Sequence, residues 1–83
     1  MDYTLIVPIT KPNGDKIETV AVKESYTGRD IKAIGNAGGE GSAMIALVAA
    51  ATGLSENTVL NMDARDVRQI GTMAKPFLAG GEA

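Results

Sequence analysis

The stretch Ala43-Met-Ile-Ala-Leu-Val-Ala-Ala-Ala51 decides the fold, because it carries no charged or hydrogen-bonding side chain. A helix that is apolar on every side has to be covered on every side. Two interpretations fit this requirement. Either the helix is a central core element clasped by the rest of the chain, or one side of it, rich in adaptable Met44 and small alanines, awaits a partner or another copy of the chain.

Helix start and stop signals continue downstream of this stretch. Ser42 is expected to cap a helix over residues 43–52, and Gly53 to end it in a left-handed conformation. Ser55 is expected to open a further short helix that reaches about Met62.

A last helix is predicted from a second capping signal, Asp63-Ala-Arg-Asp66. Beyond it, apolar residues recur at helical intervals: Val67, Ile70, Ala74 and Phe77. Pro76 should kink this helix or end it near Lys75, because proline lacks the backbone N–H and clashes with the preceding turn. We assign the carboxylates of Asp63 and Asp66 to helix capping and not to acid–base catalysis.

A shorter helix is predicted upstream, where Thr27-Gly-Arg-Asp30 also has the spacing of a capping box. It should run to Ile34, turn Ile31 and Ile34 inward, and end at Gly35. Asp30, like the later aspartates, is assigned to capping. The glycine-rich residues 36–41 are interpreted as a flexible connection, because they lack the lysine of a phosphate-binding loop and contain a glutamate.

The first quarter of the chain is predicted to form a β-hairpin. Apolar residues alternate along residues 3–10 (Tyr3, Leu5, Val7 and Ile9), and Pro8 places this strand at a sheet edge. Residues 11–15, Lys-Pro-Asn-Gly-Asp, predict a tight turn. The return strand, residues 16–23, shifts its apolar positions from Ile17 to Val20 and Val22, which predicts a bulge near Glu18 or Thr19.

These elements predict an α+β fold in a single domain over residues 1–83, with a hairpin at 3–23, a helical part at 27–79 and a flexible tail at 80–83. The chain has no His and no Cys, so it cannot form the nucleophile pairs and zinc sites that depend on them. We therefore expect no enzyme activity, no metal and no cofactor.

Charge and hydropathy argue against nucleic-acid and membrane partners. The formal net charge is -2, which leaves no cationic excess for a phosphate backbone or an anionic membrane. The apolar run at 43–51 is far shorter than the roughly 20 residues of a membrane span. A helix-turn-helix interpretation remains an alternative, because Ala49, Gly53 and Val59 have spacings that let two helices cross closely. The residues around this corner carry no Lys or Arg between Ala33 and Ala64, which weakens that alternative.

The order of features resembles the small tail assembly chaperones of contractile-tailed phages, the family found in Mu-like and P2-like phages and prophages. The resemblance covers nearly the whole chain. It is carried by the following short segments: Leu5–Pro8, Pro12–Gly14, Ile17–Val22, Lys23-Glu24, Thr27–Asp30, Ala51–Leu54, Val59-Leu60, Met62-Asp63, Asp66-Val67 and Phe77-Leu78.

The resemblance implies a non-enzymatic protein that binds the long tape-measure protein before the tail tube polymerises around it. Such a protein would act in the cytoplasm of an infected or lysogenic bacterial host and be absent from the mature virion. The tail-tube protein is a further possible partner, self-association is another, and a structural tail or baseplate component remains an alternative. The candidate partner-binding residues are apolar ones in the central helix and near the C-terminus, where closing the core is the other interpretation: Met44, Ile45, Leu47, Val48, Phe77 and Leu78.

Overall fold

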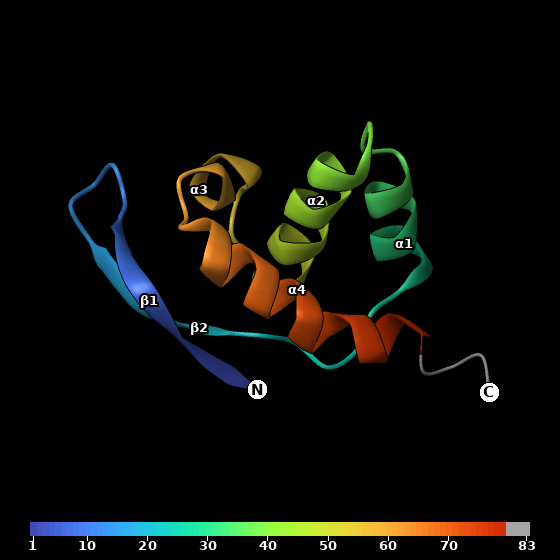
Figure 1. Ribbon diagram of the computed structural model, residues 1–83, viewed down its shortest axis with the longest axis horizontal. Helices are drawn as coiled ribbons and strands as arrows, with labels where there is room; N and C mark the ends of the chain where they lie inside the picture. The colour runs from blue at the N-terminus through green and yellow to red at the C-terminus, as the bar shows by residue number, and fades with distance from the viewer. Residues whose placement is uncertain (80–83) are drawn as a thin grey trace.

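The computed structural model describes residues 1–79 and has a β-hairpin followed by four helices, which confirms the predicted α+β class. In order, the elements are β1 (Asp2–Thr10), β2 (Lys16–Ala21), α1 (Gly28–Gly35), α2 (Glu40–Thr52), α3 (Glu56–Leu60) and α4 (Ala64–Ala79). The molecule is elongated, 41 × 26 × 19 Å, with the hairpin turn at one end and α1 towards the other (Figure 1). The predicted flexible tail at 80–83 lies outside the described residues.

Helix α2 is the element around which the others assemble. It packs against α1, α3, α4 and β2. Its buried residues are Ala46, Leu47, Val48 and Ala51, and Val48 is completely shielded from solvent. Met44 and Ile45, closer to its start, are half-buried. The C-terminal half of the apolar stretch is therefore a central core element, whereas the N-terminal half keeps some exposure.

The ends of α2 and α3 show which local signals were right. Gly53 ends α2 with φ 77°, and its N–H donates to Ala49 O at 2.9 Å, as predicted. Ser55 caps α3 through its Oγ, which accepts a hydrogen bond from Thr58 N at 3.2 Å. The predicted capping role of Ser42 is wrong: Gly39, with φ 103°, turns the chain into the helix at Glu40. Glycine tolerates this backbone conformation, so α2 begins three residues earlier than its hydroxyl signal indicates.

Helices α1 and α4 each differ in part from prediction. In α1 the Asp30 carboxylate accepts a hydrogen bond from Thr27 N at 3.0 Å, and Ile34 packs against the core as predicted. Ile31 is 58% exposed, so its predicted inward position is wrong. Helix α1 covers α2 from one side, and only one of these two isoleucines reaches the core.

Helix α4 does not end near Lys75 but continues through Pro76 to Ala79. Pro76 removes the hydrogen bond that the carbonyl of Thr72 would accept. Both residues are exposed, so water can solvate that carbonyl. Val67, Ile70 and Ala74 are buried as the helical spacing predicts, whereas Phe77 is 38% exposed.

The hairpin turn forms as predicted, with Gly14 N donating to Lys11 O at 2.9 Å and Gly14 at φ 93°. The register is irregular between the pairs Thr4↔Thr19 and Ile9↔Ile17. An irregularity at Glu18 is thus confirmed, but the extra length is on β1, where the four residues 5–8 lie opposite Glu18 alone. As a result Val7 is 41% exposed, and its predicted place on the buried face is wrong.

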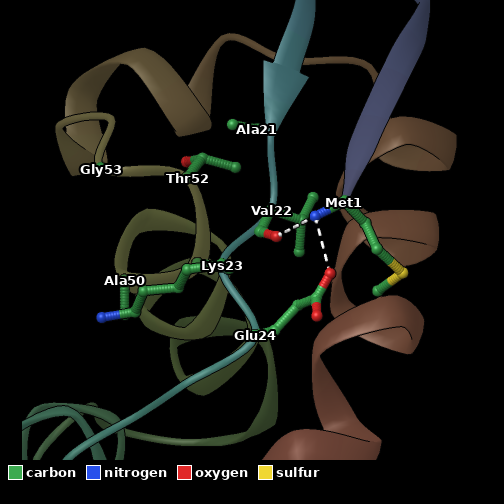
Figure 2. A pocket seen from close by; sticks show the side chains of 9 residues that line it. Met1, Ala21, Val22, Lys23, Glu24, Ala50, Thr52 and Gly53 are labelled. Atoms are coloured by element: carbon green, nitrogen blue, oxygen red, sulfur yellow. Dashed lines mark hydrogen bonds and ion pairs between the residues drawn. The ribbon is translucent and has the colours of Figure 1, made fainter.

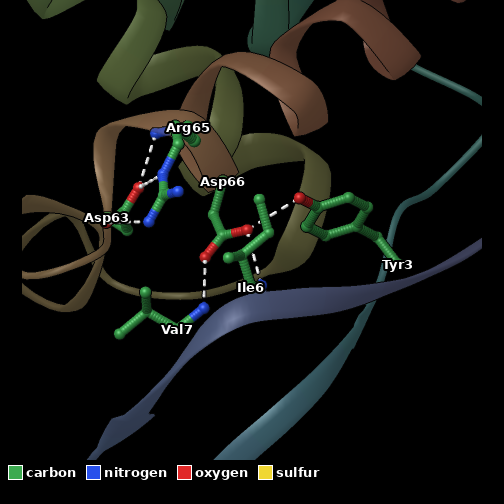
Figure 3. A network of polar contacts seen from close by, with 6 residues as sticks. All are labelled: Tyr3, Ile6, Val7, Asp63, Arg65 and Asp66. Atoms are coloured by element: carbon green, nitrogen blue, oxygen red, sulfur yellow. Dashed lines mark hydrogen bonds and ion pairs between the residues drawn. The ribbon is translucent and has the colours of Figure 1, made fainter.

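The bulged part of β1 is held by the side chain of Asp66, which is fully buried in the first turn of α4 (Figure 3). Asp66 Oδ1 accepts hydrogen bonds from Ile6 N at 2.8 Å and from Tyr3 Oη at 2.7 Å, and Oδ2 accepts one from Val7 N at 3.1 Å. These backbone N–H groups point to α4 and not along the sheet. The predicted capping role of Asp66 is therefore wrong. The predicted capping role of Asp63 is confirmed, because its Oδ1 accepts a hydrogen bond from Arg65 N at 2.9 Å.

Burial by itself raises the pKa of the Asp66 carboxyl. The hydrogen bonds from Ile6, Tyr3 and Val7 outweigh burial, and the pKa lies below its ordinary value. Burial, together with the hydrogen bond to Asp66, raises the pKa of the Tyr3 hydroxyl to about 12. The hydrogen bond between them therefore favours an ionised carboxylate and a neutral phenol.

We predict that Asp66→Ala lowers the free energy of unfolding by about 2–4 kcal/mol, because two backbone N–H groups and one hydroxyl lose a charged acceptor in a buried site. Tyr3→Phe removes one of the three bonds and should cost about 1 kcal/mol. Urea denaturation followed by far-ultraviolet circular dichroism measures both. Equal stability of Asp66→Ala and the native chain would contradict the assigned role.

We also predict that, as the pH falls, the free energy of unfolding decreases more steeply for the native chain than for Asp66→Asn. The folded pKa of Asp66 is below its unfolded value, so its contribution is complete above about pH 4 and is lost as the pH falls through the folded pKa. Asp30 and Asp63 also have lowered pKa values, but both residues are present in the native chain and in Asp66→Asn, so their contributions cancel in the comparison. The difference between the two unfolding curves, measured across that pH range, isolates Asp66; parallel curves would count against this contribution.

Candidate partner-binding groove

The predicted partner-binding residues do not all lie on an exposed face. Met44 and Ile45 are half-buried, whereas Leu47 and Val48 are buried, which fits the core interpretation for the last two. Phe77 and Leu78 lie in the last turn of α4, about 9 Å along the helix axis from Gly71, where Met44 contacts α4. Whether these residues bind a partner stays a prediction. Of the four in α2, Met44 and Ile45 keep an accessible surface.

The accessible side of Met44 faces an open hollow of about 550 Å³ between α1, α2 and α4, which we call the α2–α4 groove. Its lining residues are Ile34, Glu40, Gly41, Ala43, Met44, Leu47, Arg68 and Lys75. Apolar side chains from α1 and α2 line its interior, and charged side chains stand at its borders. An apolar trough with charged borders suits an amphipathic helix, whose apolar face it can cover.

Beside this groove, α2 packs against α4 at Gly71. Gly71 is buried in α4, and a Cβ atom there would lie 3.6 Å from Met44 Sδ and 4.0 Å from Leu47 Cδ2. These are ordinary van der Waals distances, so Met44 and Leu47 face α4 at Gly71 with room left for a methyl group.

Two further hollows continue around the start of α2. One, of about 290 Å³, shares Gly41, Met44 and Arg68 with the α2–α4 groove and extends to α3. The next, of about 530 Å³, shares Ile45 and Leu60 with it and reaches the α1–α2 connection. Leu60 is 64% exposed. Accessible apolar surface therefore follows the N-terminal half of α2 from α4 to α3.

Sequence analysis missed Arg68, Lys75 and Leu60 as members of this surface. For the two cations a signal was present, because residues seven apart lie on one face of a helix. No comparable signal marked Leu60, since its exposure depends on α3 ending there. Its neighbour Val59 is fully buried, and the sequence alone does not distinguish this buried residue from the exposed Leu60.

Another hollow, of about 600 Å³, lies where the end of β2 meets the end of α2 (Figure 2). The polar groups drawn around it already have partners: Met1 N donates to Val22 O at 2.9 Å and contacts Glu24 Oε2 at 3.1 Å. Lys23 N donates to Ala51 O at 2.9 Å, which ties the segment after β2 to the end of α2. These contacts join the hairpin to the helices, so we interpret the residues around this hollow as structural.

The structure weakens the helix-turn-helix alternative. Helix α3, the candidate recognition helix, has five residues and is about 7.5 Å long, which gives little length to lie in a major groove. In the described part of the chain no group of three or more Asp or Glu side chains is placed to hold a metal ion. Over the same residues, no helix combines the length and apolarity that crossing a membrane requires.

The comparisons with known proteins agree with a partner-binding role. The family described as phage tail assembly chaperone proteins, E, or 41 or 14, matches residues 2–79. No curated protein and no solved structure matches the chain significantly. The family match spans both strands and all four helices, so the chain belongs to the phage tail assembly chaperone proteins.

We predict that Val48→Glu and Met44→Glu behave differently. Val48 is completely buried, so an unpaired carboxylate there should cost several kcal/mol and unfold so small a chain. Met44 is half-buried beside the open groove, so a glutamate can reach water and the fold should survive. Thermal melting followed by circular dichroism separates the two, and a collapsed melt for both would show that the start of α2 is core.

Proposed function

We propose that this chain is a non-catalytic chaperone that binds the tape-measure protein during tail morphogenesis. The observation that carries the proposal is the family match over residues 2–79. The α2–α4 groove supports it, because it offers accessible apolar surface beside the central helix. The site of action would be the cytoplasm of the bacterial host, and the mature virion would lack the chain.

The physical basis of the proposal is the shielding of apolar helix faces. A long helical client exposes apolar stripes until the tail tube surrounds it, and such surfaces aggregate when they remain uncovered. A helix-in-groove contact covers a stripe through anchors spaced by three and four residues. Met44 and Ile34 would meet these anchors, and Ile45 and Leu60 in the adjoining hollows would extend the contact. The tail-tube protein is a second partner that this role would allow.

We predict that co-expression with the tape-measure protein encoded nearby raises the soluble yield of that protein and leads to co-purification. The matched control is Met44→Glu, which should fold but place a charge against the client's apolar stripe. It should therefore lose most of the rescue. The soluble fraction and the retained partner are quantified by gel densitometry after affinity purification of the chain.

Two results would contradict the proposal. The first is unchanged solubility of the tape-measure protein with no co-purification by the native chain. The second is the chain's presence in purified phage particles at a stoichiometry typical of structural proteins, measured by mass spectrometry. That result would favour the structural tail or baseplate alternative.

A further inference from the structure

Two cationic side chains of α4 stand at one border of the α2–α4 groove, beside its apolar interior. Arg68 and Lys75 are exposed, line the groove and stand seven residues apart on α4. Seven residues are two helical turns, about 10.5 Å along the axis. Both cations therefore follow the same edge of the groove, on the α4 side.

This charge is not neutralised by the surrounding structure. The ion pairs among residues 1–79 are Met1–Glu24, Lys23–Asp30 and Arg65–Asp63, and neither Arg68 nor Lys75 takes part in one. The one carboxylate in the described part of α4 belongs to Asp66, which is buried and turned towards β1. On the opposite border Glu40, in the first turn of α2, is the carboxylate that lines the groove.

We propose that the occupant of the α2–α4 groove is an amphipathic helix with acidic residues seven positions apart beside its apolar stripe. The apolar stripe would cover Met44 and Ile34, and the two carboxylates would pair with Arg68 and Lys75. This inference rests on the proposed function, because the helix would be a segment of the client. It makes Arg68 and Lys75 the residues that select which client segment binds.

Arg68 and Lys75 can select an acidic segment even though the net charge of the whole chain is negative. The net charge of -2 is spread over the surface and screened beyond about 8–10 Å at physiological salt. A carboxylate within hydrogen-bond reach of Arg68 or Lys75 experiences mainly those cations, and a guanidinium can hold it with two parallel bonds. Such charge pairs at the edge of a contact change selectivity more than they change total affinity.

The test uses three synthetic helical peptides of about 20 residues that share one apolar stripe. At two positions seven apart beside the stripe they carry Glu, Gln or Lys. Fluorescence anisotropy with the full chain should show the Glu peptide binding about tenfold more tightly than the Gln peptide, and the Lys peptide more weakly still. Raising the salt from about 0.05 to about 0.5 M should shrink these differences.

Charge reversal in the chain supplies the matched control. Arg68→Glu with Lys75→Glu should invert the order of the Glu and Lys peptides. Lys11→Glu with Lys16→Glu, at the distant hairpin turn, changes the net charge equally and should leave the order unchanged. All four positions are exposed, so both double variants should keep the native melting behaviour.

The outcomes separate this inference from the proposed function. Equal binding of the three peptides, no binding of the Glu peptide, or an order unaffected by the Arg68 and Lys75 changes would overturn the inference. Retention of the tape-measure protein by the native chain is measured independently and decides the proposed function. Self-association that disappears in the Arg68 and Lys75 variant, detected by analytical ultracentrifugation, would overturn the inference in favour of a second copy in the groove.

Discussion

The buried carboxylate of Asp66 makes the contact on which the position of the β-hairpin against the helices depends. A two-stranded hairpin is marginal by itself, so it needs support from another element. Asp66 supplies it by accepting hydrogen bonds from two consecutive backbone N–H groups and one hydroxyl of β1. The bulge in β1 is the geometric counterpart of this contact, because Ile6 and Val7 must present both N–H groups to α4. Leu5 and Ile9 on either side then remain available to the core.

Helix α2 serves two purposes along its length. Its C-terminal half contributes Val48 and Ala51 to the core, whereas its N-terminal half borders open hollows through Met44 and Ile45. Within residues 43–51 the sequence is equally apolar in both halves. The difference arises from the neighbours of α2. The segment after β2 is joined to the end of α2 through Lys23 and Ala51, whereas the start of α2 faces the groove between α1 and α4.

Features that depend on a few neighbouring residues could be predicted from the sequence. The turn at Gly14, the left-handed end at Gly53 and the cap at Ser55 are local, and all three are confirmed. Asp66 could not be assigned, because a carboxylate near a helix start has the same local signature whether it caps the helix or binds a distant strand. The groove was equally hidden, since it depends on how α1 and α4 flank α2. Its apolar floor was partly predicted through Met44, but its cations were not.

The bulge at residues 5–8 also bears on how a protein with exposed apolar residues stays dispersed. An edge strand with free N–H groups is a template for a strand of another molecule. Ile6 and Val7 are exposed and β-branched, which would make such pairing favourable. Their N–H groups are already bound by Asp66, so a foreign strand that approaches this part of β1 finds no donors there. The carboxylate that anchors the hairpin thus also blunts its edge against strand-to-strand aggregation.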